Sequence, residues 1–160
     1  MTRATSILGK EDASSREIVI SRVFDAPRER VWKAWTDPQQ IVKWWGPDGF
    51  TNTLYEMDVR PGGIWRHMMH GPDGTDYPNR VVYKEVAEPE RLAYSHGGDT
   101  DHPCQFHVTV TFEEEGGGKT RVTLRMLFET PALRDETAKA GAIEGGEQTL
   151  GRLAKHLQTL

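Results

Sequence analysis

The sequence predicts an α+β domain in which a curved antiparallel sheet of about seven strands packs against one long C-terminal helix. Three observations lead to this prediction. Strand patterns follow one another at hairpin distances through the middle of the chain, two proline-initiated helical patterns come after the first strand, and residues 130–160 carry a long helical stripe. Because the strands come in succession and the helices stand apart from them, helices gathered on one face of the sheet are favoured.

Length and composition favour one soluble domain in a reducing compartment. The chain has 160 residues, enough for a core without covalent staples, and its single cysteine, Cys104, excludes an internal disulfide and fits a cytoplasmic protein. A net charge of −4 argues against a nucleic-acid partner, and no apolar run approaches the roughly 18 residues of a membrane span. Residues 1–16 lack the apolar segment of a signal peptide. We expect them to form a flexible tail before a single domain over residues 17–160.

The domain is expected to begin with a strand and two short helices. Residues 17–24 alternate apolar and polar side chains, which is typical of a strand. Pro27 and Pro38 each stand where a helix can begin, because the missing N–H of proline costs nothing at the first helical position. The turn sequence GPDG at residues 46–49 ends the second helix.

Turns rich in glycine and proline then separate a succession of strand patterns. The clearest covers residues 105–115, where Phe106, Val108 and Val110 alternate with polar residues. The glycine triplet 116–118 turns the chain into a returning strand. The remaining strand patterns cover residues 50–58, 64–70, 77–86 and 91–96. A sheet of this length must curve to cover one helix, which leaves a groove or cavity on its concave side.

Residues 130–160 form the only segment with the pattern of a long helix. Thr130 is a suitable N-cap and Pro131 a suitable first helical residue. Gly146 is the odd member of the apolar face, because a glycine in a helix costs roughly 1 kcal/mol relative to alanine and removes a side chain from the buried side. It predicts either a gap between helix and sheet or a local break in the helix. The apolar face as a whole consists of Ile143, Gly146, Leu150, Leu153 and Leu157.

Short motifs spread along the chain resemble those of a known family. FDAPRERVW at residues 24–32 and WWGP at 44–47 come first, and further matches follow in order at residues 61–66, 71–74, 88–92 and 147–153. Together they resemble the SRPBCC (START-like, polyketide-cyclase-like) superfamily. More narrowly, they are similar to its branch named after the activator of the ninety-kilodalton heat-shock chaperone's ATPase. The resemblance covers essentially the whole order of expected elements, from residue 17 to residue 160.

The resemblance implies a helix-grip fold, in which a curved antiparallel sheet wraps around the C-terminal helix and leaves a cavity between them. Members of the superfamily bind lipids, sterols, polyketides or other apolar molecules, and some are enzymes. The branch commonly carries a tryptophan after the glycine of the last helix, whereas this chain has the pair Gly145 and Gly146. The family's usual cavity volume therefore does not transfer to this chain.

The strand pattern at residues 64–70 carries the main candidate for chemistry. Trp65, His67 and Met69 share one face by period two. An imidazole facing the cavity could act as an acid or base, or orient a polar ligand group, and Tyr83 on the next strand is the candidate partner for catalysis. The alternative is that Trp65 and Met69 belong to the core and His67 is a hydrogen-bonded wall residue.

Trp44 and Trp45 lie where the second short helix ends, by the expected cavity mouth. Adjacent helical residues point about 100° apart, so one tryptophan is expected to pack while the other lines or gates the opening, unless both pack. The full set of expected ligand-binding residues is Trp44, Trp45, Trp65, His67, Met69, Tyr83, Phe106, Val108, Ile143, Gly146 and Leu150.

Neither a metal nor a cofactor is expected. His67 and His70 point to opposite faces of a strand, and His102, Cys104 and His107 have only a loose ligand spacing. We expect the protein to bind a small apolar or amphipathic molecule. The alternatives are an enzyme of cyclase, hydrolase or dehydratase type with His67 as its acid–base, and a stress-related co-chaperone-like protein. A homodimer is left open, and chaperone binding is not expected.

Overall fold

The computed structural model describes residues 13–97 and 104–160, so most of the expected tail and the polar loop at 98–103 lie outside the described residues. A short 3-10 helix, η1 (Ala13–Arg16), leads into the first strand. Its last residue is bound to the domain, because the guanidinium of Arg16 donates to the carbonyl oxygen of Phe128 at 3.0 Å and the N–H of Phe128 donates back to the carbonyl of Arg16 at 2.9 Å.

A seven-stranded antiparallel sheet forms the body of the molecule, in the order β1-β7-β6-β5-β4-β3-β2. From β2 to β7 it is the predicted meander, and β1 joins as the outer neighbour of β7. Register shifts occur in β2 between Leu54 and Glu56 and in β4 between Tyr83 and Glu85. Such bulges bend strands. The strands are β1 (Glu17–Phe24), β2 (Thr51–Met57), β3 (Ile64–His70), β4 (Asp76–Ala87), β5 (Arg91–Gly97), β6 (Cys104–Gly116) and β7 (Lys119–Leu127).

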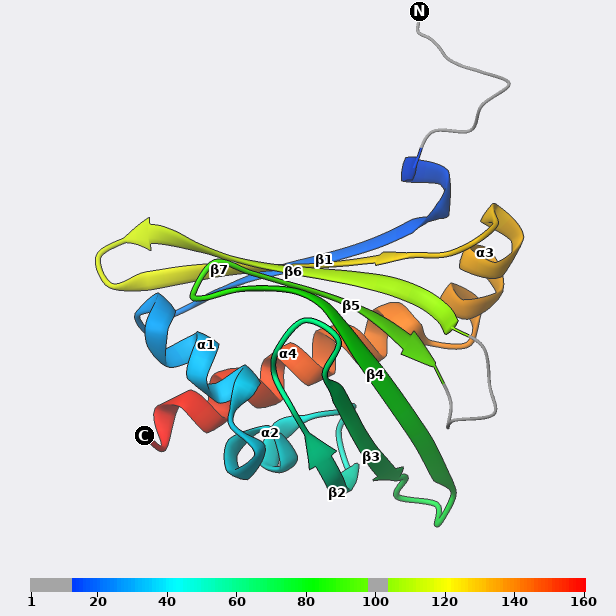
Figure 1. Cartoon of the computed structure of the whole chain (residues 1–160), viewed down its shortest axis with the longest axis horizontal. Coiled ribbons are helices and arrows are strands. Elements are labelled where there is room, and N and C mark those ends of the chain that lie inside the picture. The colour runs from blue at the N-terminus through cyan, green and yellow to red at the C-terminus, as the bar shows by residue number, and fades with distance from the viewer. Residues whose placement is uncertain (1–12, 98–103) are drawn as a thin grey trace, which may run out of the picture.

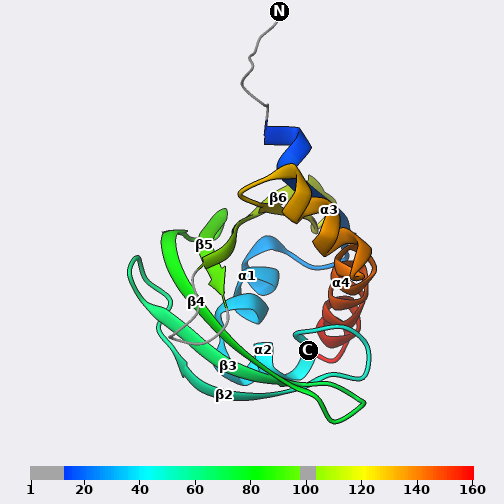
Figure 2. The ribbon, with the colours of Figure 1, turned by 90° about the vertical axis from the view of Figure 1, so that its right-hand side faces the viewer.

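The helices lie on the concave side of this sheet (Figures 1 and 2). Seen from the end, the sheet curves around α1 (Arg28–Thr36) and α2 (Pro38–Trp44), and α4 (Ala142–Gln158) closes its open side (Figure 2). A further helix, α3 (Pro131–Lys139), covers one end of α4 and contacts β1. This arrangement confirms the α+β architecture with two short helices after the first strand. Among the described residues, no helix has both the length and the apolar character needed to cross a membrane.

The segment 130–160 contains two helices rather than one. As predicted, the hydroxyl oxygen of Thr130 caps α3 by accepting from the N–H of Leu133, and Pro131 is its first residue. The break between α3 and α4 falls at Gly141, whose φ of 101° lies in the left-handed region that favours glycine. The expectation that Gly146 marks a break is therefore wrong, because α4 runs through it without interruption.

The core lies between the concave face of the sheet and the three helices α1, α2 and α4. Leu150, Leu153 and Leu157 are buried, which confirms the predicted stripe of α4. Trp35 of α1 and Trp44 of α2 are also buried, and their rings meet edge-on with centroids 5.0 Å apart. Aromatic rings thus hold the two short helices together where the sheet curves around them.

Candidate functional site

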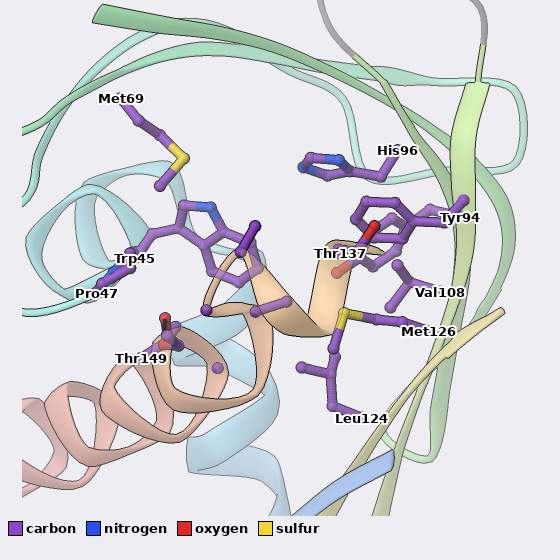
Figure 3. A pocket seen from close by; sticks show the side chains of 17 residues that line it. Trp45, Pro47, Met69, Tyr94, His96, Val108, Leu124, Met126, Thr137 and Thr149 are labelled. Atoms are coloured by element: carbon purple, nitrogen blue, oxygen red, sulfur yellow. Dashed lines mark hydrogen bonds between the residues drawn. The ribbon is translucent and has the colours of Figure 1, made fainter. Parts of the chain in front are cut away.

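A cavity of about 340 Å³ lies between the concave face of the sheet, the junction of α3 with α4, and the loop after α2 (Figure 3). Small and apolar side chains make up most of its wall. The sheet and the loop contribute its larger members, Trp45, Met69, Tyr94, Phe106, Leu124 and Met126. On the helical side the wall is made of small residues, including Ala142 and Gly145, so the space is kept open where large side chains are missing.

Strand register explains the apolar row on the sheet side of the cavity. Tyr94 of β5 is paired with Val108 of β6, which is paired in turn with Met126 of β7. Residues opposite one another in an antiparallel ladder share a face, so these three side chains stand side by side. Figure 3 shows them together at one end of the cavity. Alternation in three separate strands therefore builds one continuous wall.

His96 brings an ionisable side chain to this wall, and Figure 3 shows its ring pointing toward Trp45 and Met69. The ring stacks on that of Phe106, with centroids 4.8 Å apart and planes inclined by 22°. Its Nδ1 is buried and has no hydrogen-bond partner in the described part of the chain. Burial lowers the pKa of His96 to about 4, because a charged ring there would lose its hydration. At neutral pH His96 is an uncharged imidazole.

Arg152 of α4 fixes the loop that carries Trp45. The guanidinium of arginine carries several N–H donors in a rigid plane, and here it donates to the carbonyl oxygens of the turn. Gln148 of α4 adds a further bond, since its Oε1 accepts from the N–H of Asp48 at 3.1 Å, so the position of Trp45 depends on that of the helix. The acceptors of Arg152 are the carbonyl oxygens of Lys43 (3.4 Å), Trp45 (3.1 Å), Gly46 (2.9 Å), Pro47 (2.9 Å) and Phe50 (3.0 Å).

The structure brings together one part of the expected set of ligand-binding residues. Five of them lie at the cavity wall, namely Trp45, Met69, Phe106, Val108 and Gly146. They come from the loop after α2, from β3, from β6 and from α4, segments that are far apart in the sequence and meet only in the fold.

The other expected residues lie in or against the core, outside this wall. Trp44 is buried, and its Nε1 donates to the carbonyl oxygen of Ala34 at 3.1 Å. Of the two adjacent tryptophans, Trp44 therefore packs and Trp45 lines the cavity. The remaining members outside the wall are Trp65, His67, Tyr83, Ile143 and Leu150.

His67 is buried beside the cavity, with 1% of its surface exposed. Its ring stacks on Trp65, with centroids 4.2 Å apart, and meets the ring of Trp45 edge-on at 6.5 Å. Burial and, to a smaller extent, the nearby His96 lower the pKa of His67 to about 3. Neither ring nitrogen has a hydrogen-bond partner within the described residues.

The structure does not bring His67 and Tyr83 together as a catalytic pair. The residue opposite His67 in the β3–β4 ladder is Asn79, and Tyr83 lies four positions further along β4. At about 3.3 Å per residue, this separation is roughly 13 Å along the strand. Burial raises the pKa of the Tyr83 hydroxyl further above its ordinary value, which makes it a poorer proton donor. The geometry therefore gives no support to an acid–base role for His67 with Tyr83 assisting.

The gap expected at Gly146 is filled by a side chain of the sheet. Gly146 borders the cavity, but its missing Cβ would point at β1 and overlap the Cδ1 of Ile20. The glycine thus lets α4 approach β1 closely. The space left by the absent side chain is occupied by Ile20 and is not part of the cavity.

Within residues 13–97 and 104–160, no group of three His, Cys, Asp or Glu side chains gathers as metal ligands. Of the three residues considered for such a site from the sequence, His102 lies outside the described residues, and so does the side chain of Cys104. His107 is exposed on β6.

The sequence prediction does not include Tyr94, His96 or Arg152. Period-two alternation indicates the first two, because Leu92, Tyr94 and His96 fall on one face of β5. Arg152 has no such signal. Its acceptors are backbone carbonyls that lie between 102 and 109 positions earlier in the chain.

Comparison with known proteins shows similar chains in several bacteria. A family model described as Activator of Hsp90 ATPase homolog 1-like protein matches residues 25–158. Protein Ms6760 from Mycobacterium smegmatis is 29% identical, with a TM-score of 0.79 over 91% of this chain and 93% of that chain. A protein from Arthrobacter aurescens, with a solution NMR structure, is 27% identical, with a TM-score of 0.84 over 94% of this chain and 91% of that chain. The AHSA1 protein from Silicibacter pomeroyi, at 21% identity, shares the fold with a TM-score of 0.74 over 89% of this chain and 98% of that chain. No curated protein matches the chain.

Proposed function

The chain belongs to the Activator of Hsp90 ATPase homolog 1-like family, and from this premise we propose that it binds a small apolar or amphipathic molecule in the cavity between the sheet and α4. The observation that carries the proposal is the cavity itself. Its volume of about 340 Å³ falls within the range of about 300–1,000 Å³ that is usual for small-molecule sites. An apolar ligand gains about 25 cal/mol for each Å² of apolar surface that it removes from water.

The absence of charge at the described wall supports an uncharged ligand. None of the described residues that line this cavity is Lys, Arg, Asp or Glu. A charged group placed there would lose its hydration and meet no opposite charge from those residues. His96 is uncharged at neutral pH, so it adds no charge to the wall. We therefore expect the buried part of the ligand to be neutral.

A panel of apolar ligands tests the proposal. Trp45 stands in the wall, so binding is expected to change tryptophan fluorescence and to raise the melting temperature. Val108→Phe fills space at the wall and should weaken binding. The matched control is Val19→Phe on β1, a site that is 47% exposed, and it should bind like the wild type. If no ligand of a broad panel changes either readout, the proposal fails.

The proposal does not extend to chaperone binding. The family's description refers to the activation of a chaperone ATPase, which is a property of the protein for which the family is named. We expect a pull-down with the ninety-kilodalton heat-shock chaperone to be negative. Capture of the chaperone by the wild-type chain would contradict this expectation.

A further inference from the structure

Buried polar atoms without partners gather beside Trp45. They are the Oδ1 of Asn52, the Nε1 of Trp65 and both ring nitrogens of His67, and none has a hydrogen-bond partner among the described residues. Asn52, Trp65 and His67 line one narrow pocket together with Trp45. Buried polar groups are nearly always hydrogen-bonded, because leaving one unpaired costs its full hydration. Several such atoms in one pocket indicate a place where a polar group is bound.

This pocket and the apolar cavity adjoin at Trp45, which lines both spaces. With Trp45 in place, the pocket has no room for the centre of a water-sized sphere. The indole meets Trp65 edge-on, with ring centroids 5.0 Å apart, and its side chain is half-buried. A shift of this one side chain toward the cavity would therefore connect the two spaces.

Asn52 offers a hydrogen-bond acceptor to the pocket. Its Nδ2 donates to the carbonyl oxygens of Trp45 at 2.9 Å and Val42 at 3.3 Å. Because both partners are acceptors, this end of the amide must be the nitrogen, and the free end must be the oxygen. Trp65 supplies the complementary group, since an indole Nε1 is a donor only.

His67 adds one donor and one acceptor. Burial lowers the pKa of His67, so the ring is neutral at pH 7 and carries a single N–H. The pocket therefore suits a neutral group that both donates and accepts. A carboxylate only accepts and would bring a charge, and none of the described residues that line this pocket is Lys or Arg. A ketone or ether would leave the Asn52 oxygen without a donor. A hydroxyl pairs with three of these four atoms, because it donates its one hydrogen to the Asn52 oxygen and accepts from the Nε1 of Trp65 and from the single N–H of His67.

We propose that the ligand carries a hydroxyl group on an otherwise apolar body, and that this hydroxyl is bound by Asn52, Trp65 and His67 when the Trp45 indole moves toward the cavity. The apolar body shares the cavity of about 340 Å³ with the displaced indole. This inference rests on the proposed function and adds to it the chemical class of the ligand and the residues that recognise its polar group.

Three probes that share one ring system test the inference. They are 1-naphthol, 1-methylnaphthalene and 1-naphthoate, which present a hydroxyl, a methyl and a carboxylate at the same position. Titrations of the 15N-labelled full chain at pH 7 give the affinities and report on each indole N–H. We expect 1-naphthol to bind about tenfold more tightly than 1-methylnaphthalene, and 1-naphthoate to bind most weakly. The indole signal of Trp65 should move with 1-naphthol and not with 1-methylnaphthalene.

Two variants locate the hydroxyl. His67→Phe keeps a ring stacked on Trp65 and removes both nitrogens, so it should abolish the preference for 1-naphthol. His70→Phe, on the same strand and half-exposed, is the matched control and should keep the preference. The comparison of probes on the wild-type chain stands even if His67→Phe fails to fold.

The outcomes separate this inference from the function on which it rests. Equal affinities for 1-naphthol and 1-methylnaphthalene would overturn the hydroxyl site and leave the apolar cavity standing. Tightest binding of 1-naphthoate, or a Trp65 signal that 1-naphthol does not move, would overturn it as well. Failure of all three probes to bind would overturn both the inference and the proposed function.

Discussion

Acid is expected to destabilise this protein through the buried His67 and the half-buried His96. The pKa of His67 is lowered to about 3 and that of His96 to about 4, in both cases chiefly by burial. The ordinary value, about 6.5, applies to the unfolded chain. A histidine with a lower pKa in the folded state takes up its proton more readily when unfolded. Its contribution to stability is therefore present above pH 6.5 and is lost as the pH falls below that value.

The magnitude follows from the size of these shifts. Between pH 6.5 and pH 5 each histidine is protonated in the unfolded chain and neutral in the folded one, and one pKa unit corresponds to about 1.4 kcal/mol. Over about 1.5 units each site lowers the free energy of unfolding by about 2 kcal/mol, and the two together by about 4 kcal/mol. The loss should continue down to about pH 4 for His96 and about pH 3 for His67. Total stabilities are typically only about 5–15 kcal/mol, so the effect is large.

Urea unfolding at pH 7, 6 and 5 checks this prediction, with the wild type, His67→Phe, His96→Phe and the double variant. Packing changes caused by phenylalanine are the same at every pH, and the acidic side chains are common to all four proteins. Both effects cancel in the difference between the curves. The pH-dependent loss should shrink by about 2 kcal/mol in each single variant and by about 4 kcal/mol in the double variant. A double variant whose curve runs parallel to that of the wild type would refute the reasoning.

Three further substitutions probe the helices and the loop. Arg152→Met removes the donors to five carbonyl oxygens and should lower the free energy of unfolding by about 2–4 kcal/mol in urea titrations. Tryptophan fluorescence should shift to the red as Trp45 is released. Unchanged stability and emission would contradict the role of Arg152 in holding the loop. Gly141→Ala places a Cβ at a φ of 101° and should cost about 1–2 kcal/mol, and an unchanged melting temperature would count against the break there. Gly146→Trp must displace Ile20, so calorimetry should show a loss of about 1–3 kcal/mol. A variant as stable as the wild type would argue against the close approach of α4 to β1.

Local periodicity accounts for the parts of the fold that could be predicted. Phe106, Val108 and Val110 alternate with polar residues, and they lie on one face of β6 as expected. Leu153 of the α4 stripe is fully buried. Proline at position 131 and threonine at position 130 likewise begin α3 where their chemistry requires. Each of these signals is contained within a few neighbouring residues, so the sequence alone is sufficient to read them.

The site was harder to predict because its features depend on contacts between distant segments. Period two places Trp65 and His67 on the inner face, but only the curvature of the sheet decides that they lie beside the cavity and not in its wall. The sequence predicts a gap at Gly146, but in the fold this space is occupied by Ile20, which lies 126 positions earlier in the chain. The role of Arg152 also depends on a distant segment. Its acceptors are backbone carbonyl oxygens, and no pattern of side chains in the sequence indicates them.

The pairing of β1 with β7 sets an order of events during synthesis. Ser21 and Thr123, which face each other in this ladder, lie 102 positions apart. When β1 leaves the ribosome, its only sheet neighbour in the described structure has not yet been made. Strands β2 to β6 can pair with one another as they are synthesised. Strand β1 stays unpaired, with its apolar face uncovered, until nearly the whole chain has been made. Of the seven strands of the described sheet, the one that comes first in the sequence is thus among the last to be joined, and during this long interval chaperones and proteases can reach the growing chain.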